Sequence, residues 1–120
     1  MIFAITLIGA TARVAPLFHD FWLDEAWSYL LVRDLVTTPA DIITTLHIDN
    51  NHPLNSLALY LLGTTVDWPV YRFPAWMSGV ACIPLAFVVM RRFGEYHAFY
   101  AMLLAACSYP LIVYSTEARG

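Results

Sequence analysis

The sequence contains no lysine, and charged residues make up only 12% of its 120 positions. Its six arginines are outnumbered by nine acidic residues, so the formal net charge is −3. A protein that binds nucleic acid needs a concentrated basic surface to meet the phosphates. The shortage of cations therefore argues against a nucleic-acid partner.

Cysteine is also scarce, and the two that occur, Cys82 and Cys107, both lie within apolar runs. Free cysteine in such a setting usually behaves as a small apolar side chain. We therefore expect both residues to be buried and expect no disulfide between them.

Apolar residues are abundant, since 60% of the chain is hydrophobic and the mean hydropathy is +0.63. These values are typical of membrane proteins. Three apolar runs, 1–18, 73–90 and 98–114, approach the length that crosses a bilayer. An 18-residue helix is about 27 Å long, which barely covers the hydrocarbon core. The sequence thus predicts an all-α membrane protein with about three transmembrane helices.

The first of these runs is interrupted by Arg13, whose side chain we expect to reach the membrane interface near the outer end of the helix. An alternative for this run is a cleaved signal peptide, with Ala10-Thr11-Ala12 as the small-residue cleavage site. No basic segment precedes the run, which favours the transmembrane interpretation.

The region 19–72 has a different character, because it holds seven of the nine acidic residues but only two arginines. Residues 26–36 show helical apolar spacing, and Pro39 suits the first turn of a second short helix. Residues 53–62 are apolar but too few to cross a bilayer, so we expect a helix that lies in the interface. This region is predicted to be one long loop with interfacial helices.

The pair Arg91-Arg92 is the densest positive cluster and is therefore expected on the cytoplasmic side. Counting spans backward from this turn places the acidic loop outside the cytoplasm and the N-terminus inside. Counting forward places Glu117 and Arg119 outside as well. Three spans would then bring Asp24, Glu25 and Glu117 to one face of the plasma membrane.

Asp24 and Glu25 stand between two tryptophans at the start of the helix expected over 26–36. A helix N-terminus stabilises carboxylates, so simple capping is one explanation for this pair. Glu117 follows an apolar span, where an ionisable residue is costly unless it is paired or functional; an ion pair with Arg119 is its simpler explanation. The alternative explanation is that Asp24, Glu25 and Glu117 belong to one shared acidic site.

Carboxylates with a histidine suit either a divalent cation or a general base. Asp24, His52 and Glu117 are therefore candidate metal ligands, and a divalent cation is a candidate cofactor. Their spacing matches no metal-binding motif, and His52 taken alone is more often a turn residue.

Five short blocks, in order along nearly the whole chain, resemble the N-terminal part of GT-C membrane glycosyltransferases. The closest resemblance is to the Rgt-type and protein O-mannosyltransferase-like group, to which the aminoarabinose transferase is related. The blocks are Leu23-Asp24-Glu25-Ala26, Asn51-His52-Pro53-Leu54, Arg72-Phe73-Pro74-Ala75, Arg91-Arg92-Phe93-Gly94 and Tyr114-Ser115-Thr116-Glu117-Ala118-Arg119. The family has many spans and uses a polyprenyl-phosphate-linked sugar on the extracytoplasmic side.

The resemblance implies a role for each matched residue. Asp24 would be the general base that deprotonates the acceptor hydroxyl, with Glu25 as its partner and Glu117 as a further catalytic residue. The lipid phosphate of the donor would be bound by His52, Arg119 and Arg72. Where the family commonly has a second proline after His-Pro this chain has Leu54, and Thr116 stands where the family often has glutamine.

Family members continue with further spans that complete the lipid and acceptor sites, so we expect this chain to be an N-terminal portion that is inactive without them. Which sugar, lipid carrier and acceptor are used is not encoded in the blocks described. The alternative function is a non-catalytic small membrane protein whose acidic loop binds a partner. A secreted soluble domain is disfavoured by the two later spans.

Overall fold

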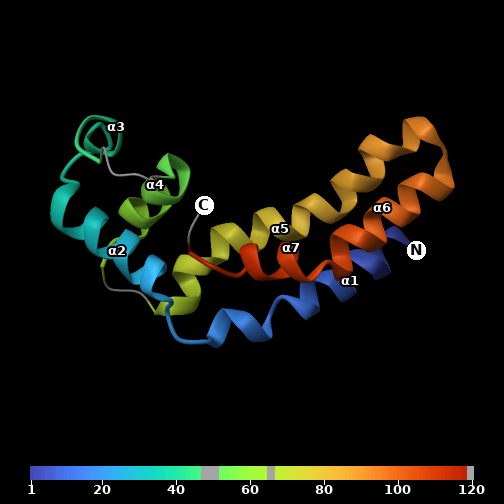
Figure 1. Cartoon of the computed structure of the whole chain (residues 1–120), viewed down its shortest axis with the longest axis horizontal. Helices are drawn as coiled ribbons and strands as arrows, with labels where there is room; N and C mark the ends of the chain where they lie inside the picture. Colours follow the sequence, from blue (N-terminus) through green and yellow to red (C-terminus); the bar gives the residue numbers. More distant parts are fainter. Residues whose placement is uncertain (47–51, 65–66, 119–120) are drawn as a thin grey trace.

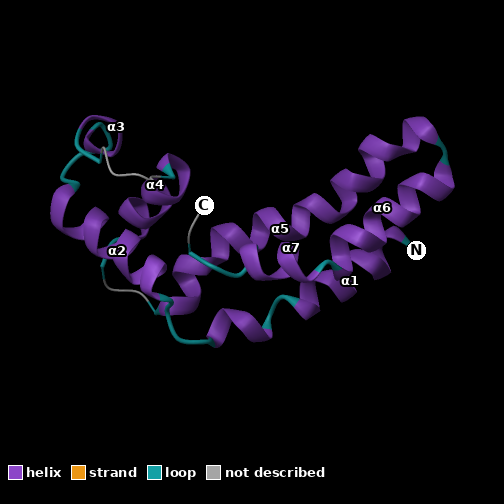
Figure 2. Ribbon diagram, viewed as in Figure 1, coloured by secondary structure: helices purple, strands orange, loops and turns teal. Residues whose placement is uncertain are grey.

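The computed structural model describes residues 1–46, 52–64 and 67–118. These residues form helices and connecting turns and contain no strand. The molecule is elongated, with extents of 48 × 28 × 20 Å. Figures 1 and 2 show helices α2, α3 and α4 gathered at one end, and α1, α5, α6 and α7 extending toward the other. The predicted all-α class is confirmed.

The N-terminal part consists of α1 (Ile2–Ala12), the short 3-10 helix η1 (Ala15–Phe18), α2 (Leu23–Leu35) and α3 (Asp41–Thr44). Pro16 lies in the first turn of η1, where its fixed φ angle suits a helical start. The α2 helix begins three residues before the predicted 26–36 segment and therefore includes Asp24 and Glu25 in its first turn.

Helix α4 (Pro53–Leu62) has the predicted bounds, beginning at a proline and ending before Gly63. Gly63 has a φ of 71°, a left-handed conformation that glycine adopts without steric cost. At ten residues, α4 is too short to cross a bilayer.

Helix α5 (Trp68–Met90) is the longest element and is followed by the 3-10 turn η2 (Arg91–Phe93), α6 (Glu95–Cys107) and α7 (Tyr109–Tyr114). Gly94 has a φ of 120°, which permits the sharp reversal between α5 and α6. Because α5 begins at Trp68, before the predicted start of the apolar run at residue 73, Pro74 lies inside the helix.

By length and composition, the helix Trp68–Phe93 is long and apolar enough to cross a membrane. It contains the predicted span 73–90. The pair Ile2–Phe18 and Leu23–Leu35 meets the same criterion only when taken together across a bend of 74°. The predicted span 98–114 is divided into α6 and α7 at Ser108. Among the described residues, one of the three predicted spans is therefore contained in a helix that could cross a membrane by itself.

Two groups of buried apolar side chains hold the molecule together. One lies among α2, α3, α4 and the start of α5 and includes Ala118; the other lies between α5 and α6, around Ile83 and Met102. Cys82 and Cys107 belong to neither group, because both are free and exposed. The absence of a disulfide between them is confirmed, whereas their predicted burial was wrong, since each lies outside both packed groups.

Candidate functional site

A buried ion pair between Arg72 and Glu25 joins the start of α5 to the start of α2. The Nη2 atom of Arg72 lies 2.7 Å from Oε2 of Glu25, and Nε donates to Oε1 at 2.9 Å. The two residues are 1% and 0% exposed. This two-point geometry is the strongest arrangement available to an arginine and a carboxylate.

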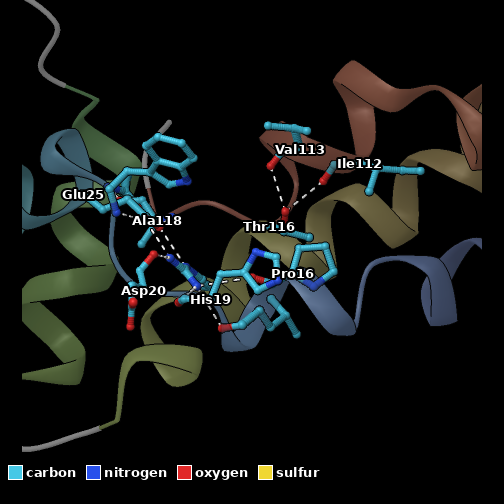
Figure 3. A network of polar contacts seen from close by, with 12 residues as sticks. Pro16, His19, Asp20, Glu25, Ile112, Val113, Thr116 and Ala118 are labelled. Carbon is cyan, nitrogen blue, oxygen red and sulfur yellow. Dashed lines mark hydrogen bonds and ion pairs between the residues drawn. The ribbon is translucent and has the colours of Figure 1, made fainter.

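The remaining N–H groups of Arg72 bind carbonyls of η1 and of the segment that connects η1 to α2. Nη1 donates to Leu17 O at 2.9 Å, and also to the carbonyls of Pro16 and His19. Nη2 donates to Asp20 O at 2.9 Å. A guanidinium has five N–H donors, and these contacts occupy all of them. Figure 3 shows Pro16, His19, Asp20 and Glu25 arranged around this network.

Glu25 is equally saturated. Besides Arg72, its Oε2 accepts the backbone N–H of Trp22 at 3.0 Å, and its Oε1 accepts the backbone N–H of Ala118. Burial by itself raises the pKa of this carboxyl, but the hydrogen bonds from Arg72, Ala118 and Trp22, together with the charge of Arg72, lower the pKa below its usual value. The bond from Trp22 is a helix cap, so the capping explanation of the acidic pair holds for Glu25.

The bond from Ala118 to Glu25 determines where Glu117 lies. Ala118 is also held through its carbonyl oxygen, which accepts from Asn55 Nδ2 at 2.9 Å. The segment after α7 is thereby fixed against both α2 and α4. Because Asp24 precedes Glu25 and Glu117 precedes Ala118, this backbone contact brings two acidic residues that are far apart in sequence to the same place.

Asp24 and Glu117 line one pocket with a volume of about 200 Å³, together with Trp22 and Leu23. Asp24 is exposed, whereas Glu117 is 7% exposed. The pocket therefore presents one carboxylate to solvent and a second carboxylate at its buried side. A carboxylate held beside a small cavity can accept a proton from a hydroxyl group placed in that cavity.

The other predicted site residues are placed differently. Arg72 and Glu25 are bound to each other, so their polar atoms are occupied within the protein. His52 is the half-buried residue immediately before α4. Arg119 lies outside the described residues. Within the described ranges, no three histidine, cysteine or acidic residues gather to form a metal site, so Asp24, His52 and Glu117 do not assemble into the predicted ligand set.

Sequence reasoning missed the role of Arg13, which follows α1. Its side chain is 1% exposed, so it is bound inside the protein and does not extend outward as expected. The Nη atoms donate to Gly9 O at 2.8 Å, Ala106 O at 3.0 Å and Ala105 O at 2.8 Å. Nε donates to Ser115 Oγ at 2.9 Å. Arg13 thus connects α1 to the end of α6 and to the turn after α7.

The carbonyls that Arg13 binds in α6 are those that a helix end leaves without partners. The regular donor to Ala106 O would be residue 110, but Pro110 has no N–H group. A proline four residues after an alanine was therefore a signal in the sequence that this carbonyl would need another donor. Nothing in the sequence identified Arg13, 93 positions away from Ala106, as that donor.

Comparison of the chain with protein-family models, with curated proteins and with solved structures found no match. The function of the protein must therefore follow from the chemistry of the site. The site has two distinctive parts: the acidic pocket, and the buried Arg72–Glu25 ion pair that positions this pocket.

Proposed function

We propose that the protein acts in a membrane glycosyltransferase of the GT-C type, which transfers a sugar from a polyprenyl-phosphate carrier to an acceptor outside the cytoplasm. The observation that carries the proposal is the pocket shared by Asp24 and Glu117. The five sequence blocks provided the expectation that these residues act together, and the pocket places them within one small volume.

In the proposed reaction, an acceptor hydroxyl oxygen attacks the anomeric carbon of the donor sugar. The bond from that carbon to the phosphate oxygen breaks with inversion, and the electron pair leaves with the polyprenyl phosphate. Asp24 accepts the hydroxyl proton as general base. Glu117, on the buried side of the pocket, orients the acceptor through hydrogen bonds.

Arg72 receives a different role from the one that the resemblance implies. Its five N–H groups are occupied by Glu25 and by the segment before α2. We therefore assign Arg72 and Glu25 as positioning residues that hold Asp24 and Glu117 at one pocket. His52 and Arg119 remain the proposed ligands of the departing phosphate, whose negative charge requires stabilisation.

The ends of α5 support the proposed sidedness. Arg72 lies near the start of this helix and Arg91-Arg92 follow its end. A 23-residue helix is about 35 Å long, which is enough to cross the hydrocarbon core. If Arg91-Arg92 face the cytoplasm, the Arg72 end and the acidic pocket face outward. We retain three spans, with the N-terminus inside, as part of this proposal.

The test is Asp24→Asn in the complete protein, in the membrane of cells that express it. The assay measures release of free polyprenyl phosphate from polyprenyl-phosphate-linked hexose and aminoarabinose donors. Loss of a general base should lower the rate about 100-fold or more. Asp34→Asn is the matched control, because Asp34 lies on the same helix but is exposed and paired with Arg33.

Near-normal release by Asp24→Asn would exclude Asp24 as the base. If the unaltered protein released no polyprenyl phosphate from any of the donors tested, the result would favour the non-catalytic alternative. The unfolding temperatures of both variants are compared with that of the unaltered protein, so that a lower rate can be distinguished from loss of the fold.

A further inference from the structure

Another cavity lies beside Arg13, with a volume of about 350 Å³. Its walls come from α4, α5, the end of α6 and α7, and most of its lining is apolar. The residues of α5 that line it are Pro74, Ala75, Ser78, Gly79 and Cys82. These positions follow the spacing of one helix face, and four of the five have small side chains, which is why the face is hollow.

Arg13 contributes a full positive charge to this cavity. Its four hydrogen-bond acceptors are three backbone carbonyls and the hydroxyl of Ser115. These dipoles solvate the guanidinium but do not neutralise it, and none of the described carboxylates forms an ion pair with it. A guanidinium has five N–H donors, and the hydrogen bonds of Arg13 use four. Buried charges in proteins are usually paired with an opposite charge.

We propose that this cavity binds an anionic membrane lipid, with the acidic headgroup at Arg13 and the hydrocarbon chain along the small-residue face of α5. Arginine pairs well with phosphate oxygens. Free inorganic phosphate fits the site poorly, because the apolar walls offer it no other partners. Pro74 to Cys82 spans about 12 Å of helix, so the apolar wall accommodates part of a chain as well as a headgroup.

This inference depends on the membrane location of α5 and does not depend on sugar transfer. Its readout is therefore separate from the activity assay. The chain supplies the reporter, because both cysteines are exposed but only Cys82 lines the cavity.

The experiment follows N-ethylmaleimide labelling in dodecyl maltoside micelles. Cys107→Ser leaves Cys82 as the only thiol, and Cys82→Ser leaves Cys107. Phosphatidylglycerol at about ten times its Kd should slow labelling of Cys82 by about 10-fold, because labelling requires the empty cavity. Labelling of Cys107 should not change, and neither phosphatidylcholine nor inorganic phosphate should slow either reaction.

Two variants test the site directly. Ala75→Phe fills the cavity wall without altering Arg13 and should abolish the protection of Cys82. Ala81→Phe places the same side chain on an exposed position of α5 outside the cavity and should retain the protection. Arg13→Gln should remove the preference for phosphatidylglycerol. If this variant does not fold, the comparison of Ala75→Phe with Ala81→Phe still tests the site.

Equal protection by phosphatidylcholine would overturn the charge-based assignment, and equal protection by inorganic phosphate would overturn the assignment to a lipid. Protection of Cys107 to the same extent as Cys82, or protection that survives Ala75→Phe, would show that the lipid does not bind in this cavity.

Discussion

Arg72 and Arg13 are both 1% exposed, but they are stabilised in different ways. Arg72 binds a buried carboxylate as well as backbone carbonyls, and its charge is neutralised by Glu25. Arg13 binds carbonyls and one hydroxyl, so its charge is solvated without being neutralised. The first arrangement closes a junction between helices, and the second leaves a positive potential beside an apolar cavity.

This difference indicates how each arginine contributes to function. All donors of Arg72 and all acceptors of Glu25 are occupied, so this pair serves geometry and holds the acidic pocket together. Arg13 supports the broken end of α6 and retains a charge that attracts an anion. The protein thus uses one buried arginine, Arg72, to position other residues, and another, Arg13, to keep a positive charge beside the cavity.

The largest effect is expected from Glu25→Ala, which leaves Arg72 buried without its counter-ion. Removing one partner of such a pair costs about 3–5 kcal/mol, and the variant also loses the anchor of Ala118. Thermal unfolding in detergent, followed by tryptophan fluorescence, measures the effect. Glu95→Ala is the control, because Glu95 also lies in the first turn of a helix but is exposed.

If Glu25→Ala unfolded at the same temperature as Glu95→Ala, the ion pair would not be what holds α2 to α5. A double variant, Glu25→Leu with Arg72→Met, should be less destabilised than the sum of the single variants, since no unpaired charge remains.

Acid should weaken the same junction, with a smaller effect than deletion of the side chain. The pKa of Glu25 is lowered in the folded protein, so its stabilisation is complete above its unfolded value of about 4.3. The stabilisation is lost as pH falls through the lowered folded pKa. Unfolding temperatures between pH 7 and pH 3 measure this loss.

Glu25→Gln should lack this contribution and serves as the reference for the acid experiment. Asp41, whose pKa is lowered by hydrogen bonds from Thr38 and Thr37, and Asp34, whose pKa is lowered by Arg33, titrate in both proteins. The difference between the two pH profiles therefore isolates Glu25. Parallel profiles down to pH 3 would contradict the assignment.

The sequence predicted local elements well where a proline, a glycine or an apolar period marks them. The bounds of α4 follow from Pro53 and Gly63, and the turn after α5 follows from Gly94. The acidic residues at the start of α2 were also expected in its first turn. These features depend on the conformational limits of single residues.

The sequence did not reveal the two arginine networks, because their partners are distant in the chain. Glu25 and Arg72 are 47 positions apart, and Arg13 and Ser115 are 102 apart. Which buried carbonyl needs a donor becomes known only when the helix ends are placed. The common location of Asp24 and Glu117 was expected from sidedness, but its cause, the bond between Ala118 and Glu25, was not.

The smallest effect is expected from Ser115→Ala, which removes one neutral acceptor from Arg13 and no charge. The lost hydrogen bond to a buried charged group should lower the free energy of unfolding by about 1–3 kcal/mol, because three carbonyls continue to solvate the guanidinium. Ser28→Ala is the control, since the Ser28 hydroxyl is bonded locally to Asp24 O on an exposed face. Denaturant titration of both variants compares them. A loss as large as that of Glu25→Ala would mean that Arg13 depends on this hydroxyl as strongly as Arg72 depends on its carboxylate, and the distinction between the two arginines would disappear.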